Sequence, residues 1–327
     1  ALPIYLLIES NLAGLLDRVN PRTVFNCVAF GAYSFETDGQ LIYATNFAFT
    51  TRLLEQLRRR SVTRYIHAGS SSEYGDNCSG PDERAHLAPN SHYAVSKAAA
   101  AHLIDYYGRH LKFPCANLRL YSVYGPFEDS SRLIPNLVMN GLSGRLPEFV
   151  RRDISRDFIH VDDVNAAFVK TALNLRDGDY GASFNIGTGR KTTMAEIADL
   201  GRGLFNVADA PRFTMEDRKW DVSDWFSRPD LAREKVGWTP TIPLEQGLLR
   251  TAEWMRALPN LEAYEKSSKK YLLDSQSSVS AIIACYKDFG FAISRFVQNK
   301  IRIVRTIFFV THFREEAGAK PRALDRL

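Results

Sequence analysis

Long apolar runs and paired cysteines are missing from this chain of 327 residues, and no leader sequence is predicted. No run approaches the roughly 18–20 apolar residues that a membrane-spanning helix needs, so no transmembrane segment is predicted. The N-terminal stretch has neither a basic flank nor a cleavage signature, which predicts no signal peptide. The four cysteines form no CxxC pair, which argues against a zinc ribbon or a dithiol centre. Such cysteine usage fits a reducing compartment, and we expect a cytoplasmic protein.

An excess of one charge sign is also missing from most of the chain. The formal net charge is +5, and residues 289–327 hold eight Lys/Arg against three Asp/Glu. The whole excess therefore belongs to this tail, and residues 1–288 are balanced. Charge gives no support for a nucleic-acid partner of the main body. With 45% hydrophobic residues, the chain can form one large domain or two ordinary ones with a sizeable core.

Short apolar runs alternate with segments whose apolar residues recur at helical spacing. The run over 23–29 is continuous and contains β-branched residues, as in a strand buried on both faces of a parallel sheet. Alternation of strand and helix predicts an α/β fold with right-handed crossovers. Strands are expected over 23–29, 64–68, 113–121, 156–161 and 183–187. Helices are expected over 41–60, 93–111, 132–142, 162–173, 193–205 and 244–258.

A serine, a tyrosine and a lysine are distinguished by their spacing. Ser70 follows the strand expected over 64–68, at the carboxyl end where open α/β sheets bind ligands. Tyr93 lies 23 residues later, and Lys97 follows it at i+4 on the same helix face. A free phenol with a pKa near ~10 is a poor base, but a nearby ammonium favours the phenolate. The three side chains therefore predict removal of a proton from a secondary alcohol as hydride leaves its carbon.

In these and further motifs, the chain resembles the extended short-chain dehydrogenases/reductases of the nucleotide-sugar epimerase/dehydratase kind. The matching motifs occur in order and span residues 15–258. They are Val24-Phe-Asn-Cys-Val-Ala29, Thr45-Asn46, Gly69-Ser-Ser-Ser-Glu-Tyr-Gly75, Tyr93-Ala-Val-Ser-Lys97, Arg119-Leu-Tyr-Ser-Val-Tyr-Gly-Pro126, Arg156-Asp-Phe-Ile-His-Val-Asp-Asp-Val164, Phe184-Asn-Ile-Gly-Thr-Gly189 and Val236-Gly-Trp-Thr-Pro240.

The resemblance implies a fold, a cofactor and a substrate class. A Rossmann-like dinucleotide-binding domain is expected over 1–122 and 157–190, and a smaller α+β substrate-binding domain over 123–156 and 191–258. NAD is the implied cofactor, with NADP as the alternative, and a nucleotide sugar is the implied substrate. Many members dimerise through a helix pair, so a homodimer is expected as well.

The resemblance also implies roles for individual residues. Ser70 is the active-site hydroxyl, Tyr93 the acid/base, and Lys97 the residue that lowers the tyrosine pKa and holds the nicotinamide ribose. Arg156 and Arg218 fall where members of the family bind the substrate's diphosphate, a ligand that suits a forked guanidinium. For both arginines, an ion pair with a nearby acidic residue is the alternative. The cofactor-lining positions are Val28, Ala29, Asn46, Tyr93, Lys97 and Tyr121, and the substrate-facing positions are Ser71, Ser122, Arg156 and Arg218.

Two departures from the family pattern bear on the reaction. Ser122 stands where members usually carry an asparagine that contacts the substrate. Sugar 4,6-dehydratases carry a carboxylate one or two positions after the active-site hydroxyl, and here those positions are Ser71 and Ser72. Glu73 comes one place later, and alternation would turn it to the other face if the strand continues. These residues argue against a dehydratase.

A glycine-rich turn of the GxGxxG or GxxGxxG type, which cradles a dinucleotide pyrophosphate, does not occur in the sequence. The family places this turn well before the strand over 23–29. We therefore expect that the chain lacks the first βαβ unit and that the fragment binds NAD poorly.

The C-terminal region gives weaker signals. Residues 259–278, rich in Ser and Lys, are expected to form a linker. Residues 279–288 resemble the opening strand of a GT-A glycosyltransferase, so the tail over 279–327 is interpreted as a truncated second domain. A lone amphipathic strand or helix fits that stretch equally well. His92 and His160 are expected to be hydrogen-bonded structural residues, and Asp162-Asp163 to cap a helix.

The leading functional prediction is an NAD-dependent nucleotide-sugar epimerase, acting at the 4-position by Tyr93-mediated proton transfer and hydride transfer to NAD. An NADPH-dependent 4-keto-deoxysugar reductase remains open, because it needs the same side chains. A protein without catalytic activity, either a binding module or a remnant of an enzyme, is a second hypothesis, and the missing glycine-rich turn supports it. A bifunctional chain that leads into a glycosyltransferase is a third hypothesis. No motif predicts a metal site.

Overall fold

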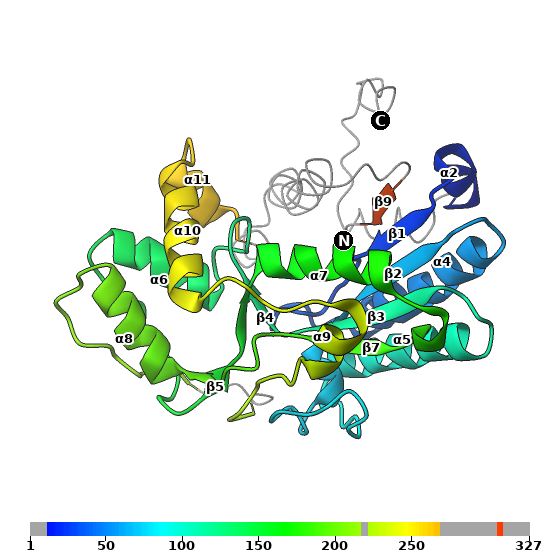
Figure 1. The fold of residues 1–327 in the computed structure, drawn as a ribbon. Helices are drawn as coiled ribbons and strands as arrows, with labels where there is room; N and C mark the ends of the chain where they lie inside the picture. Colours follow the sequence, from blue (N-terminus) through cyan, green and yellow to red (C-terminus); the bar gives the residue numbers. More distant parts are fainter. Residues whose placement is uncertain (1–11, 217–221, 269–305, 310–327) are drawn as a thin grey trace.

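The centre of the molecule is a five-stranded parallel sheet (Figure 1). The computed structural model describes residues 12–216, 222–268 and 306–309. Short, largely buried runs form the strands, and their parallel pairing confirms the predicted α/β fold. In spatial order the strands are β7 (Ser183–Ile186), β3 (Cys115–Leu120), β2 (Arg64–Ser70), β1 (Thr23–Asn26) and β9 (Thr306–Phe309).

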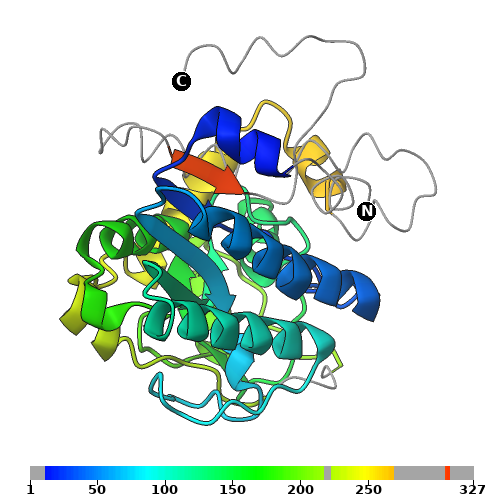
Figure 2. The same ribbon diagram turned by 90° about the vertical axis from the view of Figure 1, so that its right-hand side faces the viewer.

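Helices cover both faces of this sheet, as the turned view shows (Figure 2). On one face, buried Leu and aromatic side chains join the strands to α2 (Leu12–Val19), α4 (Phe49–Arg58) and α5 (His92–Arg109). On the other face, α7 (Val161–Asn174) and α9 (Asp230–Val236) pack on β2, β3 and β7. A sheet enclosed in this way places the carboxyl ends of its strands at one open edge, where a ligand has access.

The helix expected over 41–60 has a wider turn in its middle. It is composed of α3 (Gly39–Tyr43), the π-helical segment η1 (Ala44–Ala48) and α4 (Phe49–Arg58). A π turn adds one residue to the helical turn and commonly marks a functional position. Here it contains Asn46, whose side chain is fully buried.

A smaller lobe lies to one side of the sheet (Figure 1, left). Its core is formed by α6 (Leu133–Leu142), α8 (Met194–Leu204) and α10 (Leu244–Arg256). Short strand pairs lead into it: β4 (Ser122–Tyr124) runs parallel to β6 (Phe158–His160), and β5 (Ser155–Arg156) runs antiparallel to β8 (Thr192–Thr193). The domain boundaries given above remain a prediction.

The strand expected over 156–161 is divided at Asp157. The carboxylate of this fully buried residue accepts hydrogen bonds from Thr188 N (2.8 Å), Gly189 N (3.0 Å) and Ser227 N (3.1 Å). Because a buried charge needs such partners, the backbone turns at Asp157 instead of continuing as one strand. The result is that β5 and β6 belong to different sheets.

The expectation that Asp162 and Asp163 cap α7 is wrong. His160 is the N-cap, and its ring nitrogen Nδ1 accepts from Asp162 N at 3.2 Å. Asp163 instead accepts from Thr241 N (3.0 Å) and Ile242 N (3.0 Å), while its carbonyl accepts from Trp238 Nε1 at 2.9 Å. Asp163 therefore anchors the segment that follows α9.

Part of the expected linker is folded. Residues Leu261–Lys266 form helix α11, capped by Asn260, whose side chain accepts from Ala263 N. The Tyr264 hydroxyl donates to Glu128 O at 2.5 Å, and its ring lies 5.2 Å from that of Trp254. The polar composition of residues 259–278 therefore did not reveal the aromatic contact between Tyr264 and Trp254. Residues 269–278 lie outside the described residues.

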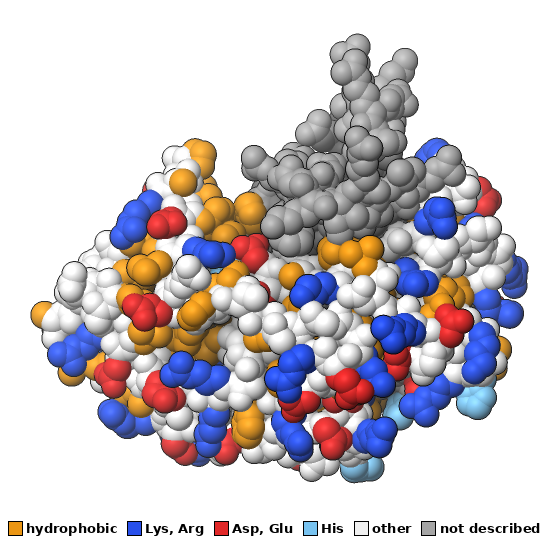
Figure 3. Space-filling view, in the orientation of Figure 1, with side chains coloured by type: hydrophobic (Ala, Val, Ile, Leu, Met, Phe, Trp, Pro, Cys, Tyr) orange, Lys and Arg blue, Asp and Glu red, His pale blue; other side chains and the backbone are white. Residues whose placement is uncertain are grey.

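The tail contributes one described element. Strand β9 pairs in parallel with β1, with Thr23 opposite Thr306 and Asn26 opposite Phe309. This short segment belongs to the main sheet, whereas the stretch 279–288 lies outside the described residues. Figure 3 shows basic and acidic side chains intermixed over one face of the main body, in keeping with its balanced charge. Among the described residues, no helix is both long enough and apolar enough to cross a membrane.

Candidate active site

Strand β2 ends at Ser70, and a tight turn follows at once. Residues Ser71–Tyr74 form the 3₁₀ helix η2, and Ser70 is its N-cap. The Ser70 hydroxyl oxygen accepts from Ser72 N at 3.1 Å, and Glu73 Oε1 accepts from Ser70 N at 2.9 Å. These two bonds make a capping box, which satisfies backbone donors at the start of the turn. The strand therefore does not continue through Glu73, whose carboxylate folds back beneath Ser70.

Helix α5 brings Tyr93 and Lys97 to the same place. Its N-cap is Ser91, whose hydroxyl accepts from Ala94 N at 3.1 Å, so both residues fall in the first turns of the helix. The Ser70 hydroxyl lies close enough to the Tyr93 side chain to favour its phenolate, which lowers the pKa of Tyr93. Lys97 Nζ lies 5.8 Å from the centre of the Tyr93 ring and donates to Ala68 O at 2.8 Å. The structure thus brings together the serine, the tyrosine and the lysine that the sequence singled out.

Burial dominates the electrostatics of Tyr93 and Lys97. Burial raises the pKa of Tyr93 to about 12, and the nearby Ser70 hydroxyl offsets only part of this rise. Burial lowers the pKa of Lys97 to about 8, against the stabilising charge of Glu73. Loss of hydration therefore sets the direction of the Tyr93 pKa shift, and the role of Lys97 in lowering that pKa stays a prediction.

The loop after β1 is held by two asparagines. Asn26 Oδ1 accepts from Val28 N at 3.1 Å, which ends β1 before the expected residue 29. The Asn46 side chain accepts from Phe30 N and donates to Phe30 O, both at 2.8 Å, and it also donates to Ser96 Oγ at 2.8 Å. Asn46 therefore ties this loop to α5. Its polar atoms hold the protein chain, in addition to any cofactor role. Val28 is buried and Ala29 is half-buried in this loop.

Tyr121 and Ser122 lie where β3 passes into β4. Tyr121 is 5% exposed, and its hydroxyl has no hydrogen-bond partner among the described residues. A buried hydroxyl without a partner is costly, so this atom marks a place for a ligand or a water molecule. Ser122 is half-buried, and its backbone N donates to Asp157 O at 2.9 Å.

The expected substrate-facing residues are connected by a tryptophan that the sequence did not reveal. Trp225 Nε1 donates to Ser71 Oγ at 2.9 Å, and the guanidinium of Arg156 lies 5.2 Å from the centre of the Trp225 ring. Arg156 also donates to Ser155 O and Val222 O. Asp153, one of the acidic residues near Arg156 in the sequence, pairs with Arg151 at 3.1 Å. Arg218 lies outside the described residues.

A buried ion pair lies behind Ser70. Arg119 Nε and Glu73 Oε2 are 2.6 Å apart, with side chains 6% and 0% exposed. Asn117 Nδ2 donates to both Glu73 oxygens at 3.2 Å, and Arg119 donates to Tyr74 Oη at 2.8 Å. The sequence motifs contained these residues, but nothing in them assigned the pair. The Ser-x-x-Glu pattern of a capping box was the available signal.

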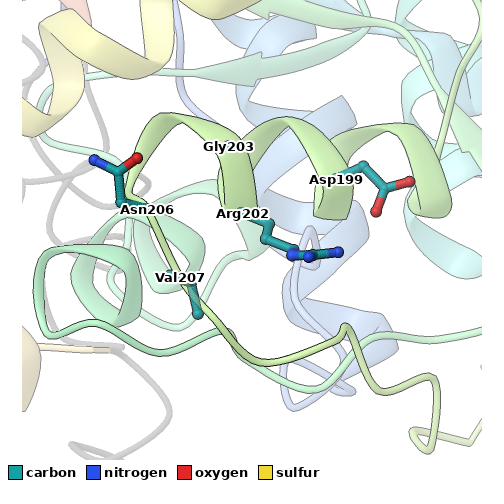
Figure 4. A pocket seen from close by; sticks show the side chains of 5 residues that line it. All are labelled: Asp199, Arg202, Gly203, Asn206 and Val207. Atoms are coloured by element: carbon teal, nitrogen blue, oxygen red, sulfur yellow. The ribbon is translucent and has the colours of Figure 1, made fainter.

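The two histidines have the structural roles expected of them. His160 caps α7, and Tyr43 Oη lies 3.1 Å from His92 Nδ1. In the part of the chain that the structure describes, no group of three or more His, Cys, Asp or Glu residues is placed to hold a metal ion. Figure 4 shows a surface pocket at the end of α8, lined by Asp199, Arg202, Gly203, Asn206 and Val207. It lies on the smaller lobe, apart from β2 and α5.

A parallel sheet with a serine at one strand end and a tyrosine–lysine pair on the next helix defines a dehydrogenase-type site. The model of the NAD dependent epimerase/dehydratase family matches residues 4–187, more than half of the chain, and the chain belongs to this family of enzymes. This confirms the resemblance seen in the motifs.

The curated relatives are 27–29% identical to the chain over the aligned residues. The chain is 29% identical over 257 residues to UDP-glucose 4-epimerase of Mycolicibacterium smegmatis. The alignment covers 76% of this chain and 81% of that protein. The chain is also 29% identical to a trifunctional UDP-glucose 4,6-dehydratase/3,5-epimerase/reductase of Arabidopsis thaliana, over 78% of this chain but only 38% of that longer protein.

Solved structures show the same architecture. UDP-glucose 4-epimerase of Thermotoga maritima, determined with UDP-glucose, superimposes with a TM-score of 0.70 at 25% identity, over 76% of this chain and 82% of that one. The protein MoeE5, determined with UDP-glucuronic acid and NAD, has a TM-score of 0.69 at 29% identity, over 76% and 83% of the two chains.

Proposed function

We propose that this chain is an NAD-dependent nucleotide-sugar 4-epimerase. The observation that supports this most is the convergence of Ser70, Tyr93 and Lys97, together with the position of Glu73. A 4,6-elimination needs a free carboxyl group beside the sugar. Glu73 is fully buried and bound to Arg119, so it is not available for that chemistry. Inversion at one hydroxyl-bearing carbon needs only Ser70, Tyr93, Lys97 and the cofactor.

The residues present fit the nicotinamide-ribose end of NAD. Lys97 uses one of its three ammonium hydrogens on Ala68 O, which leaves two for ribose hydroxyls. The unpartnered Tyr121 hydroxyl lies at the same edge of the sheet, one residue after β3. NAD, when bound, supplies the acceptor and later the donor of hydride at the sugar carbon. Its nicotinium charge would also help to lower the pKa of Tyr93.

Each side chain has a separate task in this proposal. Tyr93 takes the proton from the sugar 4-hydroxyl and returns it to the inverted product. Ser70 hydrogen-bonds the same oxygen and shares its charge with Tyr93. Lys97 holds the ribose and keeps a positive charge near the phenol ring. Arg156, supported by Trp225, faces the diphosphate, and a forked guanidinium suits that ligand.

Turnover of UDP-glucose by the purified full chain tests the proposal. With NAD added in excess, we expect UDP-galactose to form with no net reduction of NAD over repeated turnover, because the hydride taken from the sugar returns to it. Tyr93→Phe should abolish turnover, and Ser70→Ala should lower kcat by about 100-fold, as loss of one oxyanion donor does elsewhere. Steady NADPH consumption with a 4-keto sugar nucleotide would identify the reductase alternative. Turnover of UDP-glucose that survives in Tyr93→Phe would overturn the mechanism.

We also propose that the chain forms a homodimer through the helices that precede and follow β2. Their outer faces expose apolar side chains: Tyr43 and Phe47 are each 36% exposed, Val95 39% and Tyr106 49%. Such clustering marks an interaction surface. Sedimentation should give a dimer, and Phe47→Glu with Tyr106→Glu should give a folded monomer. Leu173→Glu, on the outer side of α7, is the matched control and should leave the mass unchanged. A monomeric wild type would refute this interface.

A further inference from the structure

The reacting serine is held from beneath by a carboxylate. Glu73 Oε1 accepts from Ser70 N at 2.9 Å, which fixes the backbone at the end of β2. Ser72 N donates to the Ser70 hydroxyl oxygen at 3.1 Å, which occupies one of its two lone pairs. The remaining freedom of the hydroxyl is the direction of its hydrogen. With Ser72 N fixed on one side, the hydrogen and the second lone pair are left to interact with Tyr93 and a substrate oxygen.

Arg119 holds the carboxylate in place. Three donors converge on the two Glu73 oxygens: Ser70 N, Asn117 Nδ2 and Arg119 Nε. The guanidinium is fixed in turn, because it donates to Tyr74 Oη at 2.8 Å and to Glu83 O at 3.0 Å. A charge-assisted pair whose guanidinium is held by two further bonds is rigid, and at 0% exposure Glu73 has no water to replace a lost partner.

Gly69 shows how closely this carboxylate approaches the strand. A Cβ atom at Gly69 would lie 2.6 Å from Glu73 Oε1 and 2.3 Å from Asn117 Oδ1. Real Cβ atoms do not approach oxygen so closely, so the strand must carry glycine next to the serine for the carboxylate to fit. Glycine, carboxylate and guanidinium therefore form one built arrangement behind Ser70.

We propose that Glu73 and Arg119 are a positioning pair that aims the Ser70 hydroxyl at the reacting oxygen. This inference rests on the proposed function, in which Ser70 hydrogen-bonds the sugar 4-oxygen. The pair does not touch the substrate. It acts through the turn, because a small displacement of Ser70 weakens a hydrogen bond that matters most in the transition state.

Glu73→Gln tests the pair in the full chain with NAD and UDP-glucose. The amide keeps the volume but offers only one accepting oxygen to three donors. We expect kcat to fall roughly 10- to 100-fold while KM changes less than about twofold, since the lost interaction belongs to the transition state. Glu196→Gln is the matched control. Glu196 forms the same capping box at the exposed start of α8, and its loss should leave kcat unchanged.

A double-mutant cycle separates positioning from general damage. If Glu73 acts through Ser70, Glu73→Gln should cost less than about twofold in a Ser70→Ala background. Should Glu73→Gln fold poorly, Glu73→Gln with Arg119→Met removes both charges and leaves neither unpaired. That variant should fold and still show the loss of kcat. An unchanged kcat in either variant, or an equal loss in both backgrounds, would overturn the proposal.

Amide hydrogen exchange provides a readout that does not depend on activity. We expect exchange over residues 70–74 to be at least about tenfold faster in Glu73→Gln than in wild type, because the hydrogen bond that holds Ser70 N is lost. Glu196→Gln should leave these amides unchanged. If wild type does not turn over UDP-glucose, the proposed function fails, and the exchange result alone decides the positioning. Unchanged exchange in Glu73→Gln would then refute it.

Discussion

Two capping boxes in this protein share one local design and differ in their surroundings. At Ser70–Glu73 and at Thr193–Glu196, a hydroxyl oxygen accepts a backbone N–H of the turn, and a glutamate accepts the N–H of the capping residue. The bond between the capping residue and the glutamate is 2.9 Å long in the first and 2.7 Å in the second. The local sequence pattern is therefore equally satisfied in both.

Their environments give them different consequences. Glu73 is fully buried and paired with Arg119, and it lies behind Ser70, the hydroxyl that we propose takes part in the reaction. Glu196 is exposed, and burial contributes little to its energetics. A four-residue motif thus specifies the turn, while the tertiary structure determines whether that turn serves stability alone or also a site. Four changes test this comparison.

Removal of the cation near each glutamate should give the largest difference in the free energy of unfolding between the two regions. Arg119→Met leaves the Glu73 charge buried without its partner, and we expect the free energy of unfolding to fall by about 3–5 kcal/mol. Arg190→Met removes an exposed cation near Glu196 and should cost less than about 1 kcal/mol. Urea denaturation followed by circular dichroism measures both values. Equal losses would show that the two environments do not differ as described.

Alanine at a nearby glycine should have opposite effects in the two regions. Gly69→Ala places a methyl group against Asn117 and Glu73, and we expect it to cost about 1–3 kcal/mol through overpacking. Gly203 lies within α8, and nothing described lies within 4 Å of a Cβ added there. Gly203→Ala should therefore stabilise the protein by about 0.5–1 kcal/mol. Thermal unfolding of both variants checks the signs, and a stabilising Gly69→Ala would contradict the close approach.

Loss of the capping hydroxyl should have similar effects on stability and different effects on turnover. Ser70→Ala and Thr193→Ala each remove one accepted hydrogen bond, worth about 1 kcal/mol. Only Ser70→Ala should also lower kcat. Chemical denaturation and steady-state kinetics on the same preparations measure the two effects. A loss of kcat in Thr193→Ala would mean that the smaller lobe takes part in the reaction.

Acid should reveal the smallest effect. The backbone N–H of Thr193 holds the pKa of Glu196 below its usual value. A carboxylate with a lowered pKa stabilises the fold above its ordinary pKa, and this stabilisation is lost as pH falls through the lowered value. Wild type should exceed Glu196→Gln in Tm by less than about 2 °C at pH 7, and the gap should close toward pH 3. A gap that widens in acid would contradict the assigned cause.

The sequence predicted the sheet because its strands are apolar runs. Strand β2 and the start of α5 follow directly from the pattern, and so does the convergence of Ser70 and Tyr93 at one sheet edge. Strand β1 is shorter than expected because Asn26 uses its side chain to hold Val28 N. A residue that ends a strand through its own side chain is not visible in hydrophobic periodicity.

The ion pair behind Ser70 could not be predicted in the same way. Arg119 lies inside an apolar run, and its strand was predicted correctly, but its partner comes from a turn that precedes it by 46 residues. The Ser-Ser-Ser-Glu stretch also permits an extended strand, in which Glu73 would face away from Arg119. Only the position of Asn117 and Arg119 on the neighbouring strand decides between the two. Likewise, the aromatic contact of Tyr264 on Trp254 overrides a linker-like composition.

The widened turn at Ala44–Ala48 sets the relative orientation of the two parts of this helical region. Asn46 must face Phe30 and Ser96, while Leu53, Leu54 and Leu57 further along must face the sheet. If the same residues formed an ordinary α-helix, everything beyond the widened turn would be rotated by about 100° relative to Asn46. Either the amide would leave its partners or the leucines would turn toward solvent. The extra residue in the π turn therefore allows one helical segment to direct Asn46 toward its partners and its leucines toward the sheet.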